Sequence, residues 1–393
     1  MADFIVWLGS TLVLFSIIFF MFGCIVGSFL NVVIHRLPRE MSVANPPSHC
    51  PQCGYTIPWY QNLPLITWLW QRGRCAGCDT PIPIRYFLVE LLTGLAFLGA
   101  WLLVHYHFAA GAEDPFLKQP IVAALVTLAL VTLLGGLIAS TFIDFEHFII
   151  PDELTKGGMI TGAVFSLAAP QLHGAFMGEE VSHGMALAYS LLGMACGGAI
   201  IYAVVRMGKA MFGKQTYSAE EAVRVTFGQH AMTMSGEGDE PDLELPYEEI
   251  FYREGDTITL HAEKVEYINR CLWDCEVAID AQSARIGDEE FKPSDIKHLE
   301  VMTKEVVVPR EAMGFGDVKF MAAIGAFLGW QATVFSLMFS AVLGAIVGSL
   351  LMAFRKDGAN IIPYGPYIAF AAVIWIFGGY ELWDWWWGTF GRS

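Results

Sequence analysis

The chain has 393 residues, of which 55% are hydrophobic and only 16% are charged, and its mean hydropathy is +0.48. Soluble globular proteins carry about 25% charged residues, so this composition excludes an ordinary soluble domain and indicates a membrane protein. The formal net charge is −16, and no nucleic-acid partner is expected.

Eight apolar runs follow one another along the chain. Each is near the length of about 20 residues that crosses a hydrocarbon core roughly 30 Å thick. The first run lacks a basic start and is too long for the core of a signal peptide, so we expect a retained span. The fourth and sixth are short and contain glycine. The runs are approximately residues 5–34, 86–107, 120–143, 157–171, 184–206, 314–330, 332–354 and 361–382.

The negative charge is concentrated between the fifth and sixth runs. Residues 215–310 contain 22 Asp and Glu against 9 Lys and Arg, a balance of −13, which predicts a soluble acidic insert. Within it, residues 248–268 and 298–309 alternate polar and apolar side chains as strands do, so we expect a small β-rich domain. The acidic segment SGEGDEPD, residues 235–242, contains a Gly-x-Gly-Asp sequence that no apolar run follows, and we interpret it as a flexible loop.

Basic residues cluster in three of the loops that connect the apolar runs. The positive-inside rule places these loops in the cytoplasm, and eight spans then leave both termini outside. The three clusters are Arg36, Arg39, Arg72, Arg74 and Arg85; Arg206, Lys209 and Lys214; and Arg355 and Lys356.

Four of the eight cysteines form two C-x-x-C pairs in the first basic loop, CPQC at residues 50–53 and CAGC at residues 75–78. Two such pairs, here 21 residues apart, can place four thiolates around one tetrahedral zinc, and a reducing compartment favours metal over disulfides. Redox-active pairs and unliganded cysteines are the alternatives. A site with four sulfur ligands would be structural. Cys24 and Cys196 are expected to be packing residues, and Cys271 and Cys275 are unassigned.

Two aspartates stand at the ends of apolar runs on the predicted cytoplasmic side. Asp144 ends the third run and Asp317, in MGFGDVKF, opens the sixth. A pair of carboxyl groups in a partly dry site cannot both ionise easily, which leaves an acid beside a base that can activate water. Aspartates that cap helices or face water are the simpler alternative. Pattern alone does not choose Asp144 over its acidic neighbours, which are Glu146, Asp152 and Glu153.

With these motifs in order, the chain resembles the type IV prepilin peptidases, which are bifunctional leader peptidases and N-methyltransferases. The resemblance covers the chain except for the insert, which family members commonly lack or keep shorter. The motifs that carry it are GSFLNVVIHRLP (27–38), CPQC, CAGC, RYFLVELLTG (85–94), FIDFEHFIIPD (142–152), MGFGDVKFMAAIGAFLGW (313–330) and IPYGP (362–366).

The resemblance implies an inner-membrane aspartic protease in which Asp144 and Asp317, the aspartate of Gly314-x-Gly316-Asp317, are catalytic. It implies that Cys50, Cys53, Cys75 and Cys78 bind zinc. Family members cut the short basic leader of prepilins and pseudopilins after a glycine, on the cytoplasmic face. They then methylate the new N-terminus with S-adenosylmethionine. Membrane lipid and pilus or secretion assembly proteins are the further partners implied.

We therefore expect an all-α polytopic membrane protein of about eight transmembrane helices, with a cytoplasmic zinc-binding loop and a small β-rich soluble insert. A presenilin-like protease for ordinary transmembrane helices is one alternative; a zinc-stabilised scaffold or transporter is another. The expected divisions are a first helix at 1–35, the zinc loop at 36–85, helices two to five at 86–206, the insert at 207–312, and helices six to eight at 313–393.

The methyl-donor site has no glycine-rich nucleotide loop to mark it. Three polar residues near the zinc loop are weak candidates, namely Asn31 and His35 at the end of the first run and Glu90 in the second. Ordinary hydrogen bonding between helices explains each of them equally well.

Overall fold

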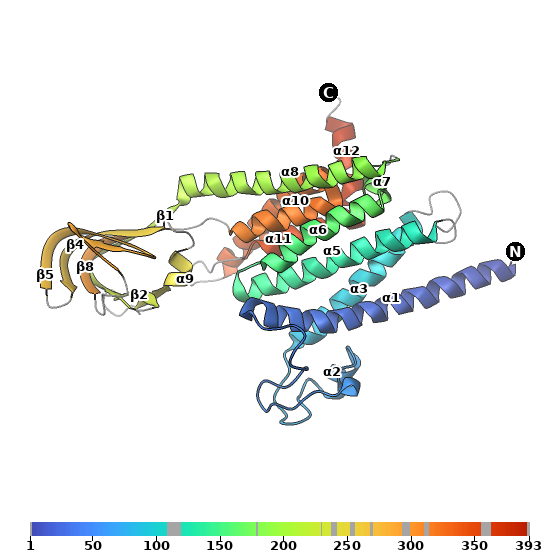
Figure 1. Ribbon diagram of the computed structural model, residues 1–393, viewed down its shortest axis with the longest axis horizontal. Coiled ribbons are helices and arrows are strands. Elements are labelled where there is room, and N and C mark those ends of the chain that lie inside the picture. The colour runs from blue at the N-terminus through green and yellow to red at the C-terminus, as the bar shows by residue number, and fades with distance from the viewer. Residues whose placement is uncertain are drawn as a thin grey trace. The chain divides into compact units, whose positions relative to one another are not determined.

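A computed structural model describes most of the chain and divides it into two compact units. We call Met1–Tyr202 with Phe315–Ser393 the helical unit and Ala203–Gly314 the sheet unit (Figure 1). The residues described are 2–107, 119–177, 180–228, 230–236, 242–251, 256–267, 270–292, 299–309, 314–354 and 363–390. The expected flexible loop at 235–242 therefore falls largely outside the described residues.

In the described part of the helical unit, six stretches are long and apolar enough to cross a membrane. The long helices run side by side, and the loop between α1 and α3 carries a short helix α2 (Figure 1). The bounds are α1 Ala2–Arg36, α2 Ile66–Trp70, α3 Ile84–His107, α5 Pro120–His147, α6 Asp152–Ala168, α7 Gln171–Met177, α8 His183–Phe212, α10 Phe315–Phe354, α11 Gly365–Ile374 and α12 Tyr380–Phe390.

The sequence predicted eight spans, and two features account for the difference from six. Helix α6 has only 17 residues, because Pro170 follows its end. The expected runs 314–330 and 332–354 form one element, α10, which is interrupted at Gly329 by a non-helical backbone with φ 81°. Only glycine adopts such a conformation readily.

The chain reverses direction at Gly329. Tyr364 hydrogen-bonds the Ser340 hydroxyl at 2.8 Å and also lies within electrostatic range of Asp317. In one straight helix Asp317 and Ser340 would be about 35 Å apart, at 1.5 Å per residue. Likewise, the Thr333 methyl group lies only 2.8 Å from where a Cβ on Gly325 would be. The two halves of α10 are therefore antiparallel neighbours, which brings Asp317 beside the start of α11.

Glycines set the closest helix contacts in this unit. In α8, a Cβ on Gly193 would stand 2.1 Å from the carbonyl oxygen of Gly325, and one on Gly197 would stand 2.7 Å from that of Met321. The spacing Gly-x-x-x-Gly places both on one helix face, and in membranes such small residues let backbones touch. Gly23 and Gly27 of α1 meet the backbone of α3 in the same way.

The sheet unit contains one eight-stranded antiparallel sheet in the order β3-β2-β1-β8-β4-β5-β6-β7 among the residues described. The strands are β1 Lys214–Phe227, β2 Ala231–Met234, β3 Leu243–Pro246, β4 Thr257–Tyr267, β5 Arg270–Asp280, β6 Ala284–Ile286, β7 Glu289–Phe291 and β8 Leu299–Pro309.

The strand expected at 298–309 is confirmed over its described part, Leu299–Pro309, which forms β8. The strand pattern expected at 248–268 is confirmed over Thr257–Tyr267, which forms β4. The first half is different, because a short helix α9 occupies Tyr247–Ile250. In β4 buried and outward residues alternate, and the buried side chains pack into an apolar core with those of its neighbours. Lys214 pairs with Pro309 across β1 and β8, so the chain enters and leaves the sheet at the same point.

The glycine contact between α8 and α10 generates a stability prediction. We expect Gly193→Ala to lower the melting temperature of the protein in detergent by several degrees, because the added Cβ overlaps a backbone oxygen and overpacking costs about 1–3 kcal/mol. Gly198→Ala, on the same helix, is the matched control, since its nearest neighbour would be 3.8 Å away. Equal melting temperatures for the two variants would contradict the close helix contact.

Candidate functional site

Asp144 lies in the last turn of α5, which continues to His147 beyond the expected end of the third span at residue 143. Its side chain is buried. The helix is closed by Phe148, whose backbone is left-handed with φ 55° and whose N–H donates to the Asp144 carbonyl oxygen at 3.0 Å. A bulky side chain rarely adopts this conformation, and backbone strain of this kind concentrates at functional sites.

Gly365 holds the Asp144 carboxylate from the opposite side. Its backbone N–H, in the first turn of α11, donates to Asp144 Oδ2 at 2.9 Å. A Cβ on this residue would be only 2.6 Å from the same oxygen. Glycine is therefore required for the carboxylate to reach the amino end of α11, where backbone N–H groups favour a negative charge.

Asp317 is brought to the same place by the start of α10, and its side chain is also buried. Ile150 packs between the two aspartate-bearing segments. Its side chain would contact a Cβ on Gly316 at 3.3 Å and one on Gly365 at 3.1 Å. Tyr364 lies within electrostatic range of Asp317 and directly precedes the glycine that binds Asp144. The structure therefore places both aspartates around Ile150 and the Tyr364-Gly365 peptide.

The acidic neighbours of Asp144 are engaged elsewhere or exposed. Asp152 forms ion pairs with Lys319 and with Lys156. Glu146 forms an ion pair with Arg85 on another face of α5. Glu153 is exposed. Of these carboxylates, Asp144 is the one that lies buried beside the start of α11.

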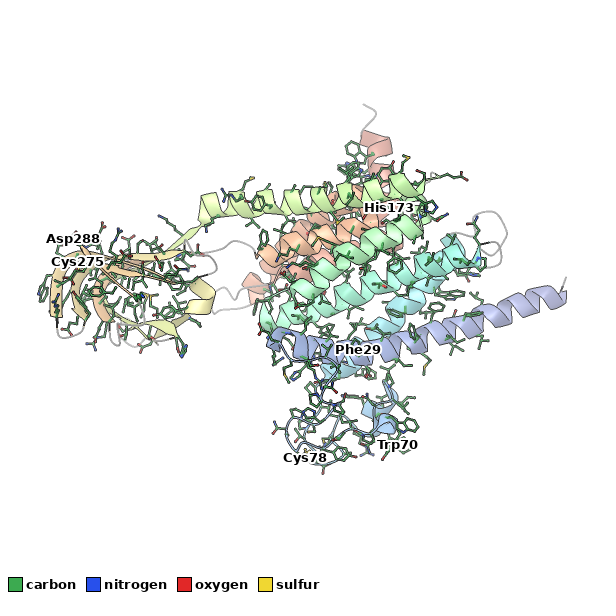
Figure 2. All side chains as sticks on the ribbon, viewed as in Figure 1. Phe29, Trp70, Cys78, His173, Cys275 and Asp288 are labelled. Carbon is green, nitrogen blue, oxygen red and sulfur yellow. The ribbon has the colours of Figure 1, made fainter. Side chains whose placement is uncertain are left out.

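The four cysteines of the loop between α1 and α3 converge, and Figure 2 shows Cys78 on this loop. Their Sγ atoms all lie within 4.8 Å of one another. Cys50 and Cys78 are 3.9 Å apart, and Cys53 and Cys75 are 4.0 Å apart. Four sulfurs at about 2.3 Å from a tetrahedral zinc would be about 3.8 Å from each other, so the arrangement fits this metal.

The two cysteine pairs have the same local fold. Cys50 N–H donates to the Tyr55 carbonyl and Gly54 N–H returns to the Cys50 carbonyl, both at 2.9 Å. Cys75 makes the corresponding bonds with Thr80 and Asp79 at 2.9 and 3.0 Å. Each turn needs a left-handed residue after its second cysteine, which is Gly54 with φ 71° in one pair and Asp79 with φ 57° in the other.

Hydrogen bonds within these turns favour thiolates, the form that binds metals. Hydrogen bonding with Thr80 lowers the pKa of the Cys78 thiol to about 6. The backbone N–H groups of Cys53 and Gln52 lower the pKa of Cys50. By contrast, the pKa of Cys53 is raised to about 11: the Tyr55 backbone acts to lower it, but burial and the neighbouring sulfurs outweigh that effect. Four thiolates this close together would need a cation between them.

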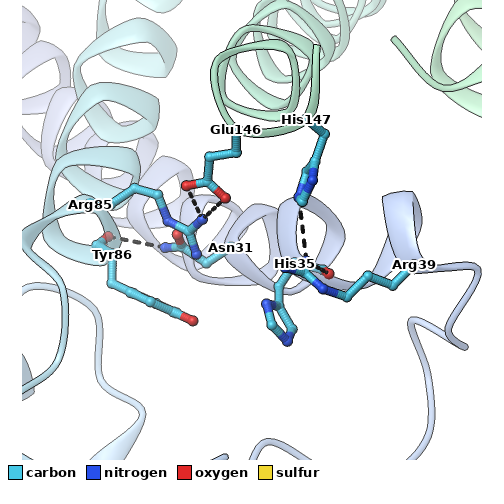
Figure 3. Close-up of polar contacts among 7 residues, drawn as sticks. All are labelled: Asn31, His35, Arg39, Arg85, Tyr86, Glu146 and His147. Atoms are coloured by element: carbon cyan, nitrogen blue, oxygen red, sulfur yellow. Dashed lines mark hydrogen bonds and ion pairs between the residues drawn. The ribbon is translucent and has the colours of Figure 1, made fainter. Parts of the chain in front are cut away.

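The three weak donor-site candidates lie together. Asn31, His35 and Glu90 line one cavity of about 630 Å³, which the cysteine loop covers and to which Glu146 of α5 contributes. Figure 3 shows the contacts along its wall, including the hydrogen bond from Asn31 to the Tyr86 carbonyl, the Arg85–Glu146 ion pair and the approach of Arg39 to His147.

Sequence reasoning missed two elements of this arrangement. The motif IPYGP gave no role to Gly365. Only the fold shows that the Gly365 N–H binds the carboxylate of Asp144, which is 221 residues away in the sequence. A glycine and a proline at the start of an apolar run were the available signal. It also weighed Glu146 as a rival of Asp144, whereas Glu146 belongs to the wall of the cavity.

Comparisons with known proteins agree along most of the chain. Residues 21–104 match the bacterial peptidase A24 N-terminal domain, and residues 299–349 match the type IV leader peptidase family. A Myxococcus xanthus protein called prepilin leader peptidase/N-methyltransferase is 42% identical over 170 residues, which are 43% of this chain and 46% of that protein. A protein of the same name from Aeromonas hydrophila is 27% identical over 94% of this chain and 93% of its own length. No solved structure matches the chain.

The cysteine geometry predicts a zinc site. We expect about one zinc per chain in protein purified under reducing conditions, because the four sulfurs are already spaced for it. Cys→Ser changes at positions 50, 53, 75 and 78 should lower the zinc content, while Cys196→Ser, the matched control in α8, should keep it. Elemental analysis provides the measurement, and metal-free reduced protein would contradict the prediction.

Proposed function

Because the chain belongs to the type IV leader peptidase family, we propose that Asp144 and Asp317 are the catalytic pair with which it removes the leader of prepilins and pseudopilins. The observation that carries the proposal is the convergence of the two buried aspartates on Ile150 and the Tyr364-Gly365 peptide. The chain is then a prepilin leader peptidase with N-methyltransferase activity, as the names of its relatives state for them.

The aspartate pair performs the hydrolysis by acid and base catalysis. One ionised carboxylate accepts a proton from water as the water oxygen attacks the scissile carbonyl carbon. The other carboxyl group, protonated, donates to the carbonyl oxygen, and the carbon–nitrogen bond then breaks as the leaving amine takes up a proton. Gly365 fixes Oδ2 of Asp144 by its N–H, which leaves Oδ1 for the water or the partner carboxyl group.

Exposed apolar side chains surround the pair and offer a surface for the substrate. Phe145, Phe148 and Ile149 on the α5 side, and Phe315 at the start of α10, are each about half exposed. We assign this surface to the apolar segment that follows the prepilin leader. Such contacts would present the peptide bond beside the aspartates while the leader remains in water.

A zinc ion held by Cys50, Cys53, Cys75 and Cys78 would be structural. The four-sulfur site has no position for water, so it shapes the loop and takes no part in hydrolysis. S-adenosylmethionine supplies the methyl group for the second reaction when it is bound. The chain's contribution to that step would be to hold the donor and the new amino terminus close together.

The charges of the loops and the lengths of the helices support a proposal for the membrane arrangement. We propose eight spans, counting α6 and the two antiparallel halves of α10, with the cysteine loop and both aspartates at the cytoplasmic face of the bacterial inner membrane. The proposed divisions are 1–35, 36–85, 86–206, 207–312 and 313–393. The sheet unit is then a cytoplasmic insert whose entry and exit strands pair with each other, which keeps it separate from the chemistry.

Substitution of either aspartate tests the protease assignment. We expect Asp144→Asn and Asp317→Asn each to abolish cleavage of a model prepilin in detergent, because asparagine keeps the shape and removes the ionisable group. Gel separation of precursor and mature prepilin is the measurement. Asp152→Asn, which removes a carboxylate that pairs with Lys319 at the surface, should retain cleavage. Near-normal processing by Asp317→Asn would defeat the assignment.

A further inference from the structure

The cavity under the cysteine loop has the dimensions of a small-molecule site. Its volume of about 630 Å³ falls within the roughly 300–1,000 Å³ typical of such pockets. One wall is the loop, including the zinc-site residues Cys50 and Cys75. The other wall comes from α1, α3 and the end of α5. A ligand inside it would contact both the loop and the helices.

A buried carboxylate faces this cavity without a cationic partner. Glu90 is buried in α3 and lines the cavity, and within the described residues it forms no ion pair with a lysine or arginine. Its Oε2 accepts a hydrogen bond from the Leu65 N–H at 2.7 Å. Leu65 itself has a positive φ of 61°, a strained conformation that the loop maintains to make this contact. A buried carboxyl group without an ion pair leaves a place for a ligand group that carries a positive charge or donates a hydrogen bond.

An unpaired hydrogen-bond acceptor lies one helix away. Asn31 in α1 is only 2% exposed, and its Nδ2 donates to the Tyr86 carbonyl at 3.0 Å, which fixes the orientation of the amide (Figure 3). Its Oδ1 is buried without a partner. Buried acceptors are normally satisfied, so this oxygen in the wall of a cavity indicates a ligand that donates a hydrogen bond.

We propose that this cavity is the binding site for S-adenosylmethionine, with Glu90 and Asn31 as its principal polar contacts. The donor carries a sulfonium, an ammonium group, hydroxyls and an aromatic amine, and these cationic and hydrogen-bond-donating groups suit the Glu90 carboxyl group and the Asn31 Oδ1. Arg39, at the exposed rim, brings a positive charge for the donor's carboxylate in addition to its contacts with the His35 carbonyl and His147. The aromatic rings of Tyr55, Trp68 and Tyr86 form apolar wall for its base.

This assignment rests on the proposed methyltransferase function and explains why a structural zinc should matter to it. Cys50 and Cys75 are part of the cavity wall, so loss of the metal would loosen that wall without touching the aspartates. The end of α5 also links the two sites. Asp144 points towards α11, whereas Glu146, two residues later, pairs with Arg85 at the cavity.

Binding of S-adenosylmethionine to the zinc-loaded protein in detergent, measured by titration calorimetry, tests the proposal. We expect Glu90→Gln to raise the dissociation constant about 10- to 100-fold, as the loss of a charged partner does, and Asn31→Leu to raise it about tenfold. Both variants should still cleave a model prepilin, which shows that they fold. Thr127→Val, a buried polar change in α5 outside the cavity, should leave binding unchanged.

The possible outcomes distinguish a wrong location for the donor site from a wrong methyltransferase function. If the wild-type protein binds the donor and both variants bind it equally well, the site lies elsewhere and the methyltransferase function stands. If the wild-type protein cleaves prepilin but neither binds the donor nor methylates the product, the proposed methyltransferase function is wrong and the protease function stands. Should a variant not fold, ultraviolet crosslinking of radiolabelled S-adenosylmethionine to the wild-type protein decides the question. Label in peptides from residues 28–90 supports the site, and label confined to α10 or α11 overturns it.

Discussion

A helix turns by about 100° per residue, so side chains two residues apart at its end point in nearly opposite directions. The last turn of α5 uses this geometry. Asp144 reaches the amino end of α11 through the Gly365 N–H, and Glu146 reaches Arg85 at the cavity under the cysteine loop. Both sites therefore depend on how far α5 extends, and they are separated by about one helix diameter, roughly 10 Å.

Close packing at glycines makes that arrangement possible. Without a Cβ, Gly365 admits the Asp144 carboxylate, and Gly316 lets Ile150 approach the segment that carries Asp317. Because the chain reverses at Gly329, the two halves of α10 lie antiparallel. Tyr364 therefore hydrogen-bonds Ser340 on one half and lies within electrostatic range of Asp317 on the other. A buried pair of carboxyl groups is costly in a membrane, and these backbone constraints hold the pair in place.

Much of this could be predicted from the sequence because the signals were local. The C-x-x-C pairs predicted the sulfur cluster, apolar runs predicted the helices, and alternation predicted strands β4 and β8. The rest depends on contacts between distant segments. The hydrogen bond of Gly365 with Asp144 leaves no pattern in the sequence. For Asn31 and Glu90 the sequence showed only polar residues near the zinc loop, and the cavity that they share appears only in the fold. The span count differed because α6 is short and the turn at Gly329 lies inside a continuous apolar stretch.

We propose that cleavage and methylation take place at separate sites on either side of α5. The most direct test of this proposal is a methylation assay with the Asp144→Asn/Asp317→Asn double variant and a synthetic peptide that already begins at the mature prepilin N-terminus. We predict transfer of one methyl group at a rate close to that of the wild-type protein, measured as a mass increase of the peptide. An intact, zinc-loaded double variant that cannot methylate this peptide would contradict it.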